Sequence, residues 1–125
     1  MLEQLGKHHS HFSDMLSEYE ECCREVRESE KERLHQKVIE IMVEQKRRKE
    51  LAQLREKLEK EGEMSQMIGE SFVKGACKLS EMGWCMEWLR EYRERGWKLS
   101  RKLYNKVAMF LVQIREFKKA LDIFQ

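Results

Sequence analysis

The chain contains no proline and no threonine, and its acidic residues are almost all glutamate, with aspartate only at Asp14 and Asp122. Proline costs about 3 kcal/mol inside a helix, and threonine and aspartate are among the weaker helix formers. The 125 residues are therefore drawn from those that cost least in a helix. Glycine is also scarce: none lies between Lys7 and Glu61, so nothing local forces a break in that stretch.

Long hydrophobic runs are missing as well. The longest, Val107 to Val112, has only six residues, whereas a membrane span needs roughly 18. No apolar signal peptide precedes the four cysteines, of which Cys22 and Cys23 are adjacent and Cys77 and Cys85 stand apart. This usage is typical of reduced thiols. We therefore expect a soluble cytoplasmic or nuclear protein with no transmembrane segment.

The signatures of known enzyme classes are absent. The sequence has no phosphate-binding G-x-x-x-x-G-K-S/T loop, no G-x-G-x-x-G after a strand, no G-x-S-x-G elbow and no H-E-x-x-H helix. Glu32 and His35 have the spacing of a di-metal bundle site, but the spacing occurs once and at an exposed phase of the helical pattern. We expect no catalytic residue, no cofactor and no enzyme activity.

A metal site is also not expected. His8, His9 and His11 lie close together, and His8 and His11 can share one helix face. The next cysteine, Cys22, lies eleven residues beyond His11, roughly 16 Å along a continuous helix. It therefore cannot complete a zinc site within one chain.

What the sequence does have is charge combined with apolar periodicity. Charged residues make up 38% of the chain, and apolar residues recur at helical spacing through most of it. High charge with such a pattern is typical of long amphipathic or coiled-coil helices. We therefore expect one all-helical domain over residues 1–125. It comprises a helix at about 10–61, a turn at about 62–66, and a helix at about 67–124 that is kinked or broken at Gly83 or Gly96.

Two features qualify this pattern. The apolar spacing shifts after Glu30 and again across Lys46 to Lys49, as stutters in a coiled coil would produce. Gly69, Ala76 and Gly83 are seven residues apart, so they form a small-residue stripe where another helix can approach closely. The alternative interpretation, that these glycines simply mark turns, carries equal weight.

Charge distinguishes two possible architectures. Residues 1–44 carry six basic and eleven acidic residues, whereas residues 93–119 carry nine basic and two acidic ones. A long antiparallel hairpin, coiled-coil-like and turning near Gly62, places these segments opposite each other. The alternative is a three-helix bundle with a long first helix and a turn at Gly96, which places the basic C-terminal segment against the basic run 46–49. Charge favours the hairpin, although such pairs select orientation rather than supply stability.

The C-terminal stretch is apolar on two faces. Trp97, Tyr104 and Leu111 recur every seven residues beside a second seven-residue pattern. One hairpin partner covers only one of these faces. We therefore expect two hairpins to pair as a homodimer in a four-helix bundle, or another helical protein to cover the second face. The predicted partner-binding residues are Trp84, Trp88, Trp97, Tyr104 and Leu111.

These features predict a non-enzymatic helical interaction or scaffold module. Basic residues alternate with the aromatic ones between Trp84 and Tyr104, which allows two other interpretations. The aromatic side chains can instead fill a helix-bundle core, with the basic residues facing the acidic first helix. Alternatively, the basic C-terminal helix binds nucleic acid or an anionic membrane. Acidic residues 1–44 argue against this last interpretation, because in the hairpin they neutralise the same surface.

Overall fold

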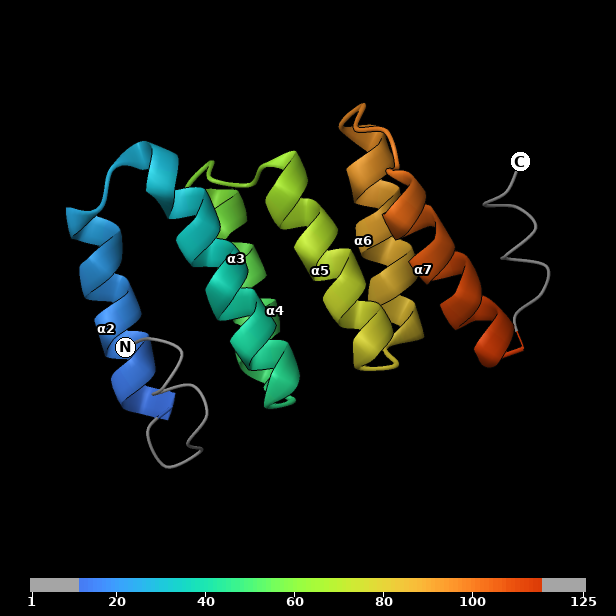
Figure 1. Cartoon of the computed structure of the whole chain (residues 1–125), viewed down its shortest axis with the longest axis horizontal. Coiled ribbons are helices and arrows are strands. Elements are labelled where there is room, and N and C mark those ends of the chain that lie inside the picture. Colours follow the sequence, from blue (N-terminus) through green and yellow to red (C-terminus); the bar gives the residue numbers. More distant parts are fainter. Residues whose placement is uncertain (1–11, 116–125) are drawn as a thin grey trace. The chain divides into compact units, whose positions relative to one another are not determined.

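The computed structural model describes residues 12–115, and these residues form α-helices and no strands. The chain is therefore all-α over this range. Its helices are short, between 13 and 17 residues each. No helix among the described residues is both long and apolar enough to cross a membrane. The helices, labelled as in Figure 1, are α2 (Phe12–Glu25), α3 (Glu28–Glu44), α4 (Arg48–Lys60), α5 (Gln66–Lys78), α6 (Met82–Glu94) and α7 (Arg101–Gln113).

The composition predicts one domain. In the structure the chain divides into two compact units, with the boundary in the sequence between Ile68 and Gly69. Unit 1 contains α2, α3 and α4, and unit 2 contains α5 from Gly69 onward, α6 and α7. Within each unit, successive helices run in opposite directions (Figure 1). Short antiparallel helices joined by tight turns are therefore the building principle of both units.

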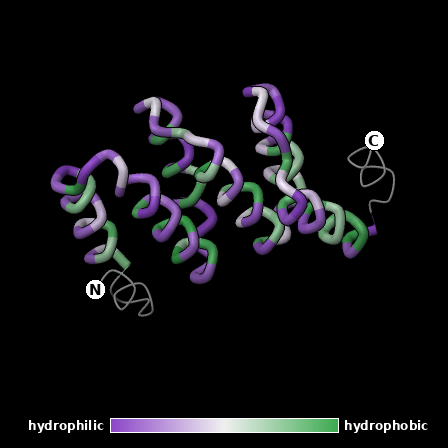
Figure 2. Tube along the Cα trace, turned by 45° about the horizontal axis from the view of Figure 1, so that its top comes forward, coloured by the Kyte–Doolittle hydropathy of each residue, from purple (hydrophilic) through white to green (hydrophobic). Residues whose placement is uncertain are grey.

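Each unit has its own apolar core, because every helix is amphipathic. Figure 2 shows apolar and polar stretches alternating along each helix turn by turn. The burial of these apolar stripes, at about 25 cal/mol per Å², is the main favourable contribution to folding. The core of unit 1 includes Phe12, Met15, Tyr19, Val38, Ile39, Met42, Leu51, Leu54 and Leu58, and that of unit 2 includes Phe72, Val73, Ala76, Cys85, Trp88, Leu89, Tyr92, Leu103, Val107 and Leu111.

The single helix expected over residues 10–61 is not found. The described part of it is interrupted twice, between Glu25 and Glu28 and between Glu44 and Arg48. These interruptions lie close to the two positions where the apolar spacing shifts. The shifts therefore mark changes from one helix to the next, and not stutters within one continuous helix.

The two breaks have different backbone causes: an extended residue, Arg27, separates α2 from α3, whereas a left-handed residue follows each of the helices α3 to α7. Behind α3, the backbone N–H of Arg47 donates to the carbonyl of Met42 at 2.8 Å, and that of Lys46 donates to the carbonyl of Val43 at 3.1 Å. This pair of bonds is a Schellman motif, which satisfies the last carbonyls of a helix and reverses the chain. The left-handed residues have φ values of 56° at Lys46, 68° at Gly62, 57° at Ser80, 83° at Gly96 and 64° at Arg115.

The second half of the chain is also divided. The break expected at Gly83 lies instead at Ser80, and Gly83 is the second residue of α6. Gly96 does end a helix, since α6 stops at Glu94 and α7 begins at Arg101. The two long helices of the expected hairpin are therefore not present, and neither is the long first helix of the alternative bundle.

The two glycines of the small-residue stripe, Gly69 and Gly83, differ in the space around them. At Gly69 an added Cβ would lie 2.9 Å from Cζ3 of Trp97 and 3.2 Å from Cδ2 of Tyr92. At Gly83 an added Cβ would meet nothing within 4 Å. Gly69 is thus a true close-approach position, but what approaches it is the ring of Trp97, which precedes α7, and not another helix.

Candidate functional site

The predicted partner-binding residues lie in unit 2, and the structure separates them into two groups. Trp88 is 7% exposed and Leu111 is 0% exposed, so helices of the same chain cover both. Trp84, Trp97 and Tyr104 are half-buried. The expectation that Leu111 lies on an uncovered face is therefore not met, whereas three of the aromatic rings retain accessible surface.

Contacts among the rings explain this burial. Trp84 stacks on Trp88 with ring centroids 5.0 Å apart and an interplanar angle of 19°. Phe72 of α5 meets Trp88 edge to face at 5.6 Å, and Tyr92 meets Trp97 edge to face at 5.2 Å. Such pairs contribute about 0.5 to 1.5 kcal/mol beyond the area they bury. Trp88 therefore lies in the core of unit 2, as the alternative interpretation of a bundle core filled by aromatic side chains expects.

The exposed apolar side chains of unit 2 lie instead at the end of α7. Met109 is 59% exposed, Val112 43% and Ile114 37%. We call these three residues the α7 surface. Sequence reasoning did not select Met109 or Val112, because both lie outside the seven-residue patterns that were assigned to packing seams. Their exposure could have been inferred from the sequence, because both are large apolar side chains at helix positions outside those packing seams.

A cavity of about 560 Å³ adjoins the α7 surface. Met109 and Ile114 line it together with the buried ring of Phe110. Among the described residues that line it, Lys78 and Lys106 are charged and none carries a carboxylate. The cavity therefore combines an apolar wall with positive charge. The remaining lining residues are Cys77, Ser80 and Gln113.

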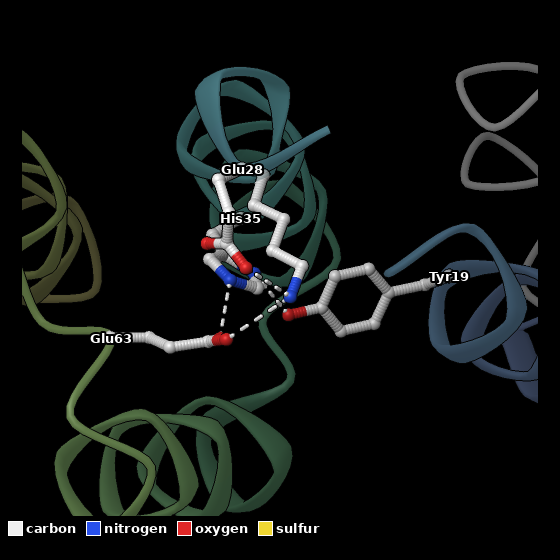
Figure 3. Close-up of polar contacts among 5 residues, drawn as sticks. Tyr19, Glu28, His35 and Glu63 are labelled. Atoms are coloured by element: carbon white, nitrogen blue, oxygen red, sulfur yellow. Dashed lines mark hydrogen bonds and ion pairs between the residues drawn. The ribbon is translucent and has the colours of Figure 1, made fainter. Parts of the chain in front are cut away.

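Unit 1 contains a buried polar chain that connects its elements (Figure 3). The hydroxyl of Tyr19 on α2 lies 2.6 Å from Nδ1 of His35 on α3, and Nε2 of His35 lies 2.9 Å from Oε2 of Glu63. His35 is 2% exposed, so its assignment to an exposed helix phase from the sequence is wrong. Glu63 lies in the turn between α4 and α5, so this chain joins three separate segments of unit 1.

The direction of these hydrogen bonds follows from the tyrosine and the glutamate together. Burial, followed by the neighbouring Cys23 and Glu63, raises the pKa of Tyr19 well above its ordinary value. Tyr19 therefore keeps its proton and can donate it. The carboxylate of Glu63 can only accept, so Nε2 of His35 carries the hydrogen of their bond, and in a neutral imidazole Nδ1 then accepts from the hydroxyl of Tyr19. Every buried nitrogen of the ring is thereby satisfied.

A second cavity, of about 480 Å³, opens beside this chain. Lys31 lies at its edge, 3.6 Å from Glu63 and 3.1 Å from Glu28. Burial raises the pKa of Cys23, so its thiol stays protonated. Neither Tyr19 nor Cys23 is therefore an activated nucleophile. The geometry describes a polar joint between helices, with lining residues Tyr19, Glu20, Cys23, Arg24, Lys31, His35, Lys57, Leu58, Glu61 and Glu63.

Basic residues form a third feature, located between the middle of α6 and the first turn of α7. Within this stretch the acidic residues are Glu91 and Glu94, and Glu94 lies 4.0 Å from Arg90. The guanidinium of Arg95 lies 5.2 Å from the ring centroid of Trp97, a cation–π distance. The stretch is therefore strongly positive. Its exposed basic residues are Arg90, Arg93, Arg95, Lys98, Arg101 and Lys102.

The described residues hold no metal-binding group, and the comparisons with known proteins found no match. Within residues 12–115, no group of three or more histidine, cysteine, aspartate or glutamate side chains is placed to hold a metal ion. His8, His9 and His11 lie outside the described residues. No protein-family model, curated protein sequence or solved structure matches this chain.

Proposed function

We propose that the chain is a non-enzymatic helical interaction module, which self-associates or binds a partner helix through its C-terminal half. The observation that carries this proposal is the α7 surface. Met109 and Ile114, which are 59% and 37% exposed, line a cavity whose wall includes Phe110, and Val112, 43% exposed, lies three residues from Met109 on α7. Apolar side chains grouped beside a concavity favour a protein partner, because binding removes their surface from water.

The chemistry of the cavity describes the partner. Met109 and Val112 are three residues apart in α7, so they lie on one helix face. A partner helix laid along this face would insert an apolar side chain beside Phe110. Lys78 and Lys106 would attract carboxylates that flank that side chain. The proposed partner segment is thus an amphipathic helix with acidic residues beside its apolar stripe.

The predicted partner-binding residues take unequal parts in this proposal. Trp84, Trp97 and Tyr104 are half-buried, so each offers ring surface to a partner. Trp88 and Leu111 are buried, so their part is to hold the neighbouring elements in place. Alanine in place of either buried residue would therefore act first on the stability of unit 2, and only through it on binding.

Static light scattering on the full chain tests this function. The proposal predicts a mass above the monomer value of 15.2 kDa at micromolar concentration, or a monomer that binds a dye for exposed apolar surface. Glutamate in place of Val112 should lower the mass or the dye signal. Met67→Glu is the matched control, because Met67 is 45% exposed but lies outside the α7 surface. A monomer without dye binding would contradict the proposal.

The exposed basic residues favour a second candidate function, binding to nucleic acid or to an anionic membrane. The earlier objection came from acidic residues that the hairpin placed opposite the basic segment. That objection does not carry over, because the long helices of the hairpin are not found. Contacts with phosphates make affinity fall steeply with salt, by roughly 0.9 log units per neutralised phosphate and per log unit of salt on duplex DNA.

Charge reversal tests this second candidate. Arg93→Glu should weaken binding to DNA, RNA or acidic vesicles and reduce its salt dependence. Lys60→Glu makes the same change at an exposed position of α4 and should have little effect. Binding that does not depend on salt, or equal effects of the two substitutions, would contradict it.

A further inference from the structure

Two cysteines in unit 2 lie in direct contact, although eight residues separate them in the sequence. Sγ of Cys77 on α5 lies 3.5 Å from Sγ of Cys85 on α6. Both thiols are buried: Cys77 is 8% exposed and Cys85 is 0% exposed. The tight turn after Lys78, with Ser80 in the left-handed conformation, brings the end of α5 against the start of α6. The contact is therefore fixed by the fold of unit 2 itself.

We propose that Cys77 and Cys85 form an oxidative modification site, at which hydrogen peroxide or a similar small peroxide converts the two thiols into an intramolecular disulfide. A disulfide needs its two sulfurs at about 2.05 Å, with the Cβ atoms roughly 3.5 to 4.5 Å apart. Sulfurs already at 3.5 Å reach that distance through side-chain rotation and a small shift of the turn. Neither helix has to unfold.

The cavity beside α7 determines which thiol meets the oxidant. Cys77 lines this cavity of about 560 Å³, whereas Cys85 does not. A small peroxide therefore reaches Cys77 first, and Cys85, which is completely covered, serves as the second thiol. The hydrogen bond with Cys85 and burial raise the pKa of Cys77, and the charge of Lys106, which lines the same cavity, partly opposes that rise.

The two thiols share a proton across their contact. A hydrogen bond from the Cys77 thiol stabilises the Cys85 thiolate and lowers the pKa of Cys85, while the same bond raises the pKa of Cys77. The first proton is therefore lost by the pair as a unit. The thiolate of the pair therefore lies mainly on Cys85, and peroxide reacts through the minor form in which the remaining proton has moved from Cys77 to Cys85, because only Cys77 lines the cavity.

The reaction proceeds in two balanced steps. The Cys77 thiolate attacks one oxygen of hydrogen peroxide and the O–O bond breaks, which gives a sulfenic acid and a hydroxide that is protonated to water. The Cys85 thiolate then attacks Sγ of Cys77, forms the S–S bond and expels a second hydroxide. Overall, two thiols and one peroxide give one disulfide and two waters. The sulfurs are oxidised, and the peroxide oxygens are reduced.

Cys22 and Cys23 provide an internal comparison. Both lie on α2, both are half-buried, and as neighbours on a helix they point in directions about 100° apart. Their side chains therefore do not face each other. If accessibility alone governed oxidation, these two thiols would react before the buried pair. If the proposal is correct, the buried pair forms a disulfide first.

The test is peptide mapping of the reduced full chain after graded exposure to hydrogen peroxide. The remaining thiols are alkylated under denaturing conditions before digestion with trypsin. Cleavage after Lys74, Lys78 and Arg90 leaves Cys77 and Cys85 on separate peptides, while Cys22 and Cys23 stay together on another. We expect the two separate peptides to appear as one linked species that lacks two hydrogen atoms, and dithiothreitol to separate them again.

Variants make the result specific. The pair Cys22→Ser and Cys23→Ser should leave the rate of disulfide formation unchanged. The pair Cys77→Ser and Cys85→Ser removes the linked species, and any disulfide that its remaining thiols Cys22 and Cys23 form should appear at least about tenfold more slowly, because those two thiols are not oriented towards each other. Sulfinic acid at Cys77 without linkage, disulfides only between separate chains, or both thiols still alkylated after Cys22 and Cys23 have reacted would each overturn the proposal. The wild-type map decides the question even if a variant fails to fold.

Discussion

Replacing Tyr19 with Phe removes one hydroxyl group and leaves the aromatic ring in its place. The ring is 3% exposed and belongs to the core of unit 1, so the substitution opens no large cavity. What is lost is the 2.6 Å bond to Nδ1 of His35. That nitrogen then loses its donor within the chain, and the His35 side chain that carries it is only 2% exposed.

The expected cost follows from this loss. Leaving a buried acceptor unsatisfied costs about 1 to 3 kcal/mol. Tyr19→Phe should therefore lower the free energy of unfolding by about 2 kcal/mol, with no further loss from packing. Urea denaturation followed by far-UV circular dichroism measures this difference.

Tyr92→Phe is the matched control. Tyr92 is also buried, at 2% exposed, but its hydroxyl donates over 3.3 Å to the carbonyl of Lys98, whose residue is exposed to solvent. Water can replace that donor, so Tyr92→Phe should cost less than about 1 kcal/mol. A Tyr19→Phe protein within about 0.5 kcal/mol of the wild type, or a larger loss for Tyr92→Phe, would refute the assignment of the buried polar chain.

Three further predictions follow. The raised pKa of Tyr19 means that its contribution to stability is present below the unfolded value of 10.0 and declines as the pH rises above it, so alkaline unfolding should be shallower in Tyr19→Phe. Gly69→Ala should destabilise unit 2 by about 1 to 3 kcal/mol, because the added methyl group overpacks against Trp97. Gly83→Ala meets open space and should stabilise unit 2 by up to about 1 kcal/mol. Urea denaturation followed by tryptophan fluorescence measures both changes. Ser100→Ala should cost about 1 kcal/mol in thermal unfolding, because the Ser100 hydroxyl accepts from the N–H of Leu103 at the start of α7.

The helical class was predictable from composition and periodicity, but the helix lengths were not. Gly62 and Gly96 are visible as potential helix ends, and both adopt the left-handed conformation that glycine favours. Lys46, Ser80 and Arg115 also adopt the left-handed conformation, although no glycine marks these helix ends in the sequence. A left-handed residue other than glycine costs roughly 1 to 2 kcal/mol, and the packing of the next helix must offset this cost. A local sequence pattern does not reveal such packing.

The candidate sites show the same limit. The seven-residue patterns selected side chains that are buried, such as Trp88 and Leu111, because a packing seam and a docking face have the same spacing. Only the arrangement of the helices distinguishes them, and it leaves Met109 and Val112 exposed instead. Likewise, Tyr19, His35 and Glu63 lie 16 and 28 residues apart, so no local motif could indicate that they form one buried chain.

Association through the α7 surface is tested most directly by sedimentation equilibrium of the full chain, with wild type, Val112→Glu and Met67→Glu compared over a range of micromolar concentrations. The self-associating form of the proposed function predicts that wild type and Met67→Glu exceed 15.2 kDa as concentration rises, while Val112→Glu remains a monomer. Equal association of all three proteins would contradict a role for the α7 surface.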